Sequence, residues 1–249
     1  MTPLRIRLAA AALGTGLLVL VPAAVLAAPA ERIRPPDSER TREQAAERTR
    51  DPEELRARCL SAIDKRLAAL AAASSRLAEA RAVTDEHEAA LSGILAATGA
   101  SLGALAGEIR ADDDAEALKA HCRSIFADHR VFALVLPRTR LVVASDAAVA
   151  AADRLDRLSA RIEQAIAKAE AAGRDVAGAE ADLDAMRAAI DSARSSAAGV
   201  ADDILPLTPT DWNDDHEVLS PAREALRSAR ADLRAARDLA RGIRAGLKA

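Results

Sequence analysis

The sequence predicts an all-α protein: an elongated, antiparallel, coiled-coil-like helical bundle with about six long helices in two three-helix sets. Alanine supplies 65 of the 249 residues, and leucine, arginine and glutamate, which also favour helices, are abundant. Aromatic residues make up 1% of the chain and valine and isoleucine are sparse, so extensive sheet is not expected. Beyond residue 52, apolar residues recur at alternating spacings of three and four, the period of one helix face.

Residues 1–30 have the layout of a secretory signal peptide. Two arginines stand in the first seven residues, an uncharged apolar run follows, and small residues allow cleavage after Ala27 or Ala30. An uncleaved anchor is the alternative, since residues 8–27 are just long enough to span a bilayer. No later stretch reaches 18 apolar residues, so no transmembrane segment is expected after leader removal. We therefore expect a secreted protein, extracellular or associated with the cell wall.

Residues 31–51 are predicted to form a charged, disordered linker. They contain six acids, six arginines and a single large apolar residue, Ile33. Such a segment cannot bury enough apolar surface to offset the entropy lost on ordering. It could serve as a spacer across a cell wall or carry no function of its own.

Residues 52–136 are predicted to form a first three-helix unit. Helices are expected over 53–82, 85–109 and 112–136. Asp85 and Glu88 look like a capping box, and acids at 112–114 suit a helix N-terminus. The apolar positions are Leu55, Cys59, Ile63, Leu67, Leu70 and Leu77, then Leu91, Ile94, Leu95, Leu102, Leu105 and Ile109, then Leu118, Cys122, Ile125, His129, Phe132 and Leu136.

Residues 131–144 are ambiguous. They can be read as a β-hairpin around Pro137, but the register of the preceding helix continues to Leu136, so helix is favoured. Pro137 is expected to separate the first unit from the second, which spans residues 137–249. Whether the two sets pack as one bundle is left open.

The second unit is predicted to contain three helices, over 138–172, 176–204 and 220–247. Gly173 is a candidate C-terminal cap, and Ser220 with Pro221 a candidate N-terminus. Strict alternation of three and four over the last two helices indicates coiled-coil-like packing, with close approach where alanine fills the seam.

Cys59 and Cys122 are the only cysteines, and in an exported chain they are expected to form a disulfide. If the first helix rises and the second descends by similar lengths, Cys122 returns to the level of Cys59. Both lie on the apolar side of their helices. The bond would therefore staple the first unit together.

No motif in the sequence predicts catalysis. Residues 99–103 match the G-x-S-x-G string of a nucleophile elbow, but that motif needs a strand before it, and here it lies in a helical pattern. Gly99, Gly103 and Gly107 are better explained by close packing of a neighbouring helix. The histidines, His87, His121, His129 and His216, form no zinc motif, and His129 is expected in the core. No enzyme activity, cofactor or metal is predicted.

The loop at 211–217 contains one weak candidate metal site. Asp211, Asn213, Asp215 and Glu217 alternate like the first oxygen ligands of a calcium loop. His216 stands where an EF-hand needs glycine, and Ala222 where it needs glutamate. A polar loop with Trp212 covering the end of the bundle is the favoured interpretation.

Arginines recur along the last helix at spacings of four and three, so that one face is basic. They are Arg223, Arg227, Arg230, Arg234, Arg237, Arg241 and Arg244. With Lys248 and three acids this helix carries +5, and residues 175–205 carry −5 (seven acids, two arginines). Ion pairing across the antiparallel seam is the favoured interpretation. An anionic partner, such as a membrane surface, a wall polymer or an acidic protein, is the alternative.

The whole pattern resembles uncharacterised secreted, alanine-rich helical proteins of high-GC Gram-positive bacteria. The similar features are Cys59, Phe132 with Pro137, Trp212 within the 212–216 loop, and the arginine- and alanine-rich last helix. The resemblance implies a secreted helical protein and no activity. Nucleic acid is not expected as a partner, because net charge is −3 and aromatic stacking residues are scarce.

These features predict a non-catalytic scaffold or adaptor of the envelope or extracellular space. Self-association through its helices is a further possibility. The alternative is an amphipathic carrier that binds a lipid surface or an apolar ligand.

Overall fold

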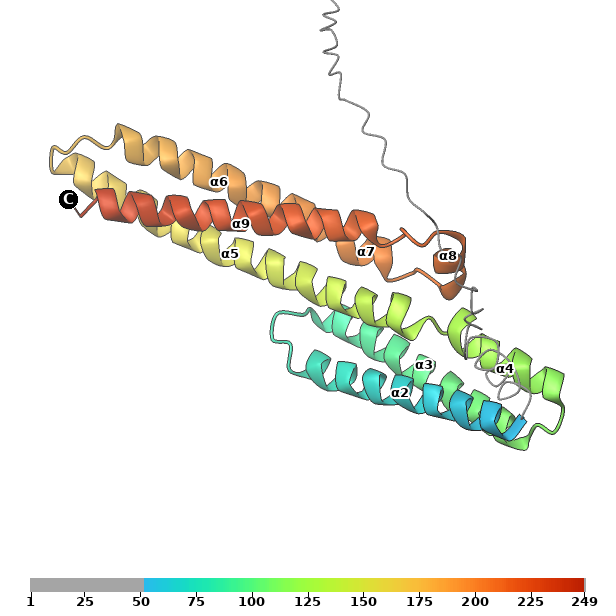
Figure 1. Cartoon of the computed structure of the whole chain (residues 1–249). Helices are drawn as coiled ribbons and strands as arrows, with labels where there is room; N and C mark the ends of the chain where they lie inside the picture. The colour runs from blue at the N-terminus through green and yellow to red at the C-terminus, as the bar shows by residue number, and fades with distance from the viewer. Residues whose placement is uncertain (1–51, 249) are drawn as a thin grey trace, which may run out of the picture. The chain divides into compact units, whose positions relative to one another are not determined.

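Helices dominate the part of the chain that the structure describes, residues 52–248, and no strand occurs in that part. The structure is a computed structural model, and the expected signal peptide and linker lie outside the described residues. In chain order the elements are α2 (Pro52–Ala78), α3 (Asp85–Ala111), α4 (Ala115–Ala127), a π-helical turn η1 (Val131–Val135), α5 (Leu136–Ala171), α6 (Ala177–Ala198), α7 (Val200–Ile204), α8 (Pro209–Asp214) and α9 (Ser220–Gly246) (Figure 1). The all-α prediction is confirmed.

The disulfide between Cys59 of α2 and Cys122 of α4 forms as predicted. The two Cα atoms are 5.6 Å apart, and 63 positions separate the cysteines in the sequence. Both side chains are buried, at 6% and 8% exposure. The bond therefore joins α2 and α4 inside the core rather than at the surface.

Local capping explains where α3 and α4 begin. Asp114 caps α4, and its carboxylate accepts the Glu116 and Ala117 N–H groups, as the acid run predicted. The predicted capping box at Asp85 is wrong by one residue. Thr84 has extended backbone angles, and its hydroxyl accepts the His87 N–H at 3.2 Å, so Thr84 is the N-cap.

The break between α4 and α5 comes earlier than predicted. Helix α4 ends at Ala127, and Arg130 has a left-handed backbone (φ 39°) before η1 begins. The expected continuous helix over 112–136 and the interruption at Pro137 are therefore wrong. Pro137 instead lies in the first turn of α5, directly after η1, and the helix continues through it.

The helical interpretation of residues 131–144 is confirmed, and Leu136 is buried as predicted, but Phe132 is not. Helix α4 ends at Ala127 and Arg130 has a left-handed backbone, so the register of α4 does not carry over into η1. Val131, Leu134 and Val135 are buried, whereas Phe132, expected on the apolar seam, is 54% exposed.

Helices α5, α6 and α9 pack against one another along most of their lengths, and α9 runs back along α6 (Figure 1). Arg174, just before α6, donates to the Gly246 and Leu247 carbonyls at the end of α9 (3.1 and 2.6 Å). Gly173 has φ +80°, and the Gly173 and Arg174 amides close the end of α5, so the predicted glycine cap is confirmed.

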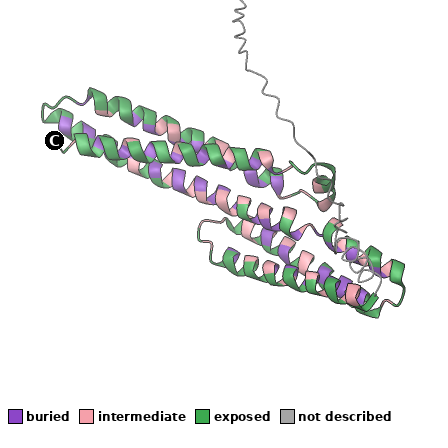
Figure 2. Cartoon of the chain, in the orientation of Figure 1, coloured by how far each residue is buried: buried purple, intermediate pink, exposed green. Residues whose placement is uncertain are grey.

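Buried residues form a continuous stripe along the inner side of each long helix (Figure 2). On α6 and α9 the predicted apolar positions are buried except Ala179, which is half-buried. Four of the buried positions are fully buried alanines: Ala193, Ala197, Ala229 and Ala236. Small side chains at these positions allow the two helices to approach closely. Helical-bundle packing is thus shown, while its coiled-coil geometry stays a prediction.

The connection between α6 and α9 departs from the predicted pattern at two points. The predicted helix over 176–204 breaks at Gly199 into α6 and α7. Leu219, not Ser220, is the N-cap of α9, because the Ser220 hydroxyl donates to the Glu217 carboxylate instead.

Arg138 holds the end of α7 against α5. Arg138 is 5% exposed, and its guanidinium donates to the backbone carbonyls of Leu205 (3.1 Å) and Leu207. Burial lowers the pKa of Arg138 from its ordinary value. The group therefore satisfies carbonyls that the helix end leaves without an intrahelical partner.

Helix α3 is long and apolar enough to span a membrane by length and composition, the one such helix in the described part of the chain. Leu91, Leu102 and Ile109 on its inner side are fully buried. The predicted close packing at its glycines is wrong. A methyl group on Gly103 would meet nothing within 4 Å, and one on Gly99 would meet only Leu67, at 4.0 Å.

Candidate functional site: the arginine groove and its neighbours

The seven arginines of α9 form one exposed row. We call Arg223, Arg227, Arg230, Arg234, Arg237, Arg241 and Arg244 the arginine row. Each follows a buried residue of α9 by one position, and a helix turns about 100° per residue. The row therefore runs parallel to the buried stripe, along one flank of it.

The predicted ion pairs between the arginine row and the acids of α6 are absent among the described residues, so this interpretation is wrong. Arg227 and Arg241 pair with Glu224 and Asp238, one helical turn away within α9 itself. A hydrogen bond, not an ion pair, joins the polar residues of α6 and α9: the Ser192 hydroxyl donates to the Asp232 carboxylate at 2.8 Å.

The arginine row lies on the flank of α9 that faces α5. Two adjoining hollows, of about 350 and 390 Å³, follow the seam between these helices and share Arg234. Together they are lined by the whole row and, on the α5 side, by Leu141, Leu155 and Leu158. We call this the arginine groove: one wall is a line of guanidinium groups and the other is apolar.

Helix α5 separates its charges between its two flanks. Two of its acids face α6, where Glu163 pairs with Arg187 (2.7 Å) and Asp153 with Arg194 (3.2 Å). Arg154 and Arg161 lie four residues before and three after Leu158, and so on the groove side. The arginine groove thus has further positive charge beside it.

The four candidate calcium ligands each bind different partners in the structure. Asp211 closes a capping box with Thr208 at the start of α8, and hydrogen bonds from the Thr208 hydroxyl and amide lower the pKa of Asp211. Asn213 bridges the Arg130 side chain (2.6 Å) and the Ala127 carbonyl (3.1 Å). The remaining two make local contacts: Asp215 accepts the Glu217 N–H, and Glu217 accepts the Ser220 hydroxyl.

Calcium at millimolar concentration is expected to leave Trp212 fluorescence and thermal stability unchanged. The reason is that Asp211 and Asn213 would each have to give up a present partner to turn toward a shared ion. No group of three or more His, Cys, Asp and Glu side chains placed to hold a metal occurs within residues 52–248. A saturable change that disappears in Asp211→Ala and Asp215→Ala would contradict this prediction.

Ser101 of the G-x-S-x-G string does meet a histidine. His129, 9% exposed as the core prediction required, lies with Nε2 3.1 Å from the Ser101 hydroxyl and Nδ1 3.2 Å from the Ser124 carbonyl. This resembles a nucleophile and base pair. However, Ser101 lies inside α3, so its own amide is part of the helix and cannot form an oxyanion hole.

A buried carboxylate joins α5 to the start of α3. Asp146 is 7% exposed, accepts the Thr84 N–H at 3.1 Å and lies 2.9 Å from His87 Nδ1 through both oxygens. Sequence reasoning missed this cluster, because Asp146 lies amid small and apolar residues of a helix whose periodicity says nothing of a partner 59 residues away.

A second charged group that the sequence did not reveal is Arg66 of α2. It is 8% exposed, and its guanidinium carbon lies 4.4 Å from the Phe126 ring centre and 5.3 Å from that of Phe132. Burial lowers the pKa of Arg66. These cation–π contacts place both phenylalanines, each about half exposed, on one side of α2.

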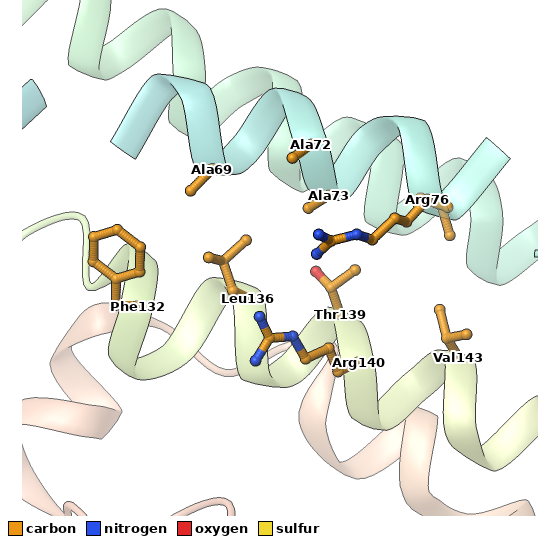
Figure 3. Close-up of a pocket in the computed structure, with 10 residues that line it drawn as sticks. Ala69, Ala72, Ala73, Arg76, Phe132, Leu136, Thr139, Arg140 and Val143 are labelled. Atoms are coloured by element: carbon orange, nitrogen blue, oxygen red, sulfur yellow. The ribbon is translucent and has the colours of Figure 1, made fainter. Parts of the chain in front are cut away.

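Beside Phe132 a pocket opens between α2 and α5 (Figure 3). It has a volume of about 390 Å³, within the size range of small-molecule sites. Leu136 and Val143 of α5 face the alanines of α2 across it, and Arg76 and Arg140 supply its charged groups.

Comparisons with known proteins identify no family for this chain. No family model, curated protein or solved structure matches the chain. The resemblance to secreted alanine-rich helical proteins therefore stays a prediction, and the arginine groove is the feature that bears most directly on function.

Proposed function

We propose that this protein is an exported, non-catalytic helical scaffold that binds a linear anionic polymer of the envelope or extracellular space along its arginine groove. The observation that carries the proposal is the exposed arginine row, which has no ion pair to another helix among the described residues. The Cys59–Cys122 disulfide supports export, since such bonds persist in oxidising compartments.

The geometry of the row favours a linear polymer over a membrane surface or a folded acidic protein. Its arginines recur every three or four residues, or about 4.5 and 6 Å along the axis, over roughly 32 Å in all. They stand in a single file along a groove rather than over a broad face. One guanidinium group can bind two oxygens of the same phosphate or carboxylate, so each arginine can hold one charged group of a regularly charged polymer.

A non-catalytic role is supported by the groove itself. Its lining consists of arginines, leucines, alanines and Asp238, and contains no serine, cysteine or histidine that could act as nucleophile or base. Ser101 of the Ser101–His129 pair is on α3 and His129 follows α4, and neither residue lines the groove.

Long-chain polyphosphate is a suitable probe for the groove. We expect the purified chain to bind it at low salt, and the triple variant Arg230→Glu, Arg234→Glu, Arg237→Glu to bind at least tenfold more weakly. Binding by the unchanged chain should weaken as salt screens the charges. Because all three arginines are exposed, the variant should unfold within about 1 kcal/mol of the unchanged chain.

A matched control changes the same net charge elsewhere. Arg81, Arg110 and Arg123 are exposed and outside the groove, so replacing them together by glutamate should weaken binding far less. Equal loss in both triple variants would mean that overall charge, not the groove, binds the polymer. Stronger retention on anionic phospholipid vesicles than on polyphosphate would overturn the choice of a linear polymer.

A further inference from the structure

The pocket between α2 and α5 combines an apolar floor with two positive groups. Ala69 and Ala73 of α2 face Phe132, Leu136 and Val143 from the opposite side. Phe132 is 54% exposed, one of two large apolar side chains in the described part of the chain that are more than half exposed. A ligand in the pocket would therefore cover apolar surface that water now contacts.

Arg76 and Arg140 reach the pocket from opposite helices. Figure 3 shows the Arg76 side chain extending from α2 and the Arg140 side chain from α5 toward the region of Leu136 and Thr139. Neither guanidinium has a hydrogen bond or an ion pair within residues 52–248, and no acidic residue lines the pocket. Two like charges around one apolar cavity repel each other, and an anion between them would remove this repulsion.

The remaining polar group in the pocket is already satisfied. The Thr139 hydroxyl donates to the Val135 carbonyl at 2.9 Å, within its own helix. The free binding capacity of the pocket therefore consists of two cationic groups and an apolar surface. A neutral sugar or a peptide backbone would find few hydrogen-bonding groups there.

We propose that this pocket binds a small amphiphile that has one carboxylate head and an aliphatic chain. The head lies between Arg76 and Arg140, and the chain runs over Leu136 toward Phe132 and Ala69. This inference does not depend on the proposed function, because the pocket shares no residue with the arginine groove.

Titration calorimetry with decanoate, dodecanoate and tetradecanoate, each below its micelle concentration, tests the proposal. Each methylene buried against the apolar floor should tighten binding about fourfold until the pocket is full. Dodecanol should bind at least tenfold more weakly than dodecanoate, because it gives the two guanidinium groups no charge. Equal binding of the alcohol, or no saturable binding of dodecanoate, would overturn the proposal.

Variants of the pocket locate the binding. Arg76→Gln and Arg140→Gln change exposed side chains, and each should weaken dodecanoate binding about tenfold. Ala73→Trp should fill the pocket and abolish binding, whereas Ala71→Trp, on the same helix but outside the pocket, should leave it unchanged. Binding that persists in Ala73→Trp and in both glutamine variants would place the ligand elsewhere.

The arginine-row triple variant separates this inference from the proposed function. It should keep its affinity for dodecanoate while it loses polyphosphate. Loss of both ligands in that variant would show that dodecanoate binds the groove and would overturn the pocket assignment.

Discussion

Removing the Cys59–Cys122 disulfide is expected to lower the free energy of unfolding by about 4 kcal/mol, the chain-entropy value for a loop that joins residues 63 positions apart. The loss should begin in α4. That helix has 13 residues, a length at which an isolated helix is marginal in water, and the bond ties it to α2. Urea unfolding with and without reductant measures the difference.

The double variant Cys59→Ala, Cys122→Ala is the control for this experiment. It should be destabilised by a similar amount and should not respond to reductant. Non-reducing mass spectrometry should show the two cysteines bonded within one chain. Two free thiols, or a stability that reductant leaves unchanged, would contradict the arrangement of α2 and α4.

Replacing Asp146 by alanine is expected to cost about 2–4 kcal/mol. The substitution leaves the Thr84 amide and His87 without their acceptor, in a site where Asp146 itself is almost fully buried. Asp146→Asn keeps an oxygen that can accept the Thr84 N–H but loses the charge. Its free energy of unfolding should therefore lie between those of the unchanged chain and Asp146→Ala. Urea unfolding again measures the effect.

Asp153→Ala is the matched control, because Asp153 lies on the same helix and pairs with Arg194 at a half-exposed site. Such a pair contributes about 0–1 kcal/mol. Comparing Asp146→Ala, His87→Ala and their combination gives the coupling between the two side chains. If Asp146→Ala costs no more than Asp153→Ala, the carboxylate does not hold α3 against α5.

Much of the helical architecture could be predicted from the sequence, because its signals are local or periodic. The apolar stripes of α2, α3, α6 and α9 repeat at the period of a helix, and Asp114 and Gly173 are residues that helix ends require. The disulfide was also predictable, since the chain has two cysteines, and an up-down-up order of helices brings them to the same level on the first and third helices.

The errors occur where one local signal competes with another. In the sequence, the apolar spacing of α4 continues to Leu136. In the structure, a left-handed Arg130 and the π turn η1 interrupt this helix, and Phe132 is exposed. Asp85 can cap a helix as well as Thr84 can, and the backbone conformation chooses between them. No periodicity separates such alternatives.

The candidate sites depended on contacts between distant segments. The spacing of the arginine row predicts that it flanks a seam, but α9 has two neighbours, and the sequence pointed to α6 where the structure places α5. Likewise Arg76 and Arg140 are ordinary surface arginines until α2 and α5 come together around one pocket.

The sequence by itself determined that the described chain is helical, which sides of its helices are buried and that Cys59 joins Cys122, because these follow from residue type and spacing along the chain. Only the tertiary structure decided which helix flank meets which neighbour. That choice places the arginine row beside α5, brings Asp146 to the start of α3 and opens the pocket near Phe132. Each of these depends on pairing segments far apart in the chain, and helix periodicity carries no information about such pairing.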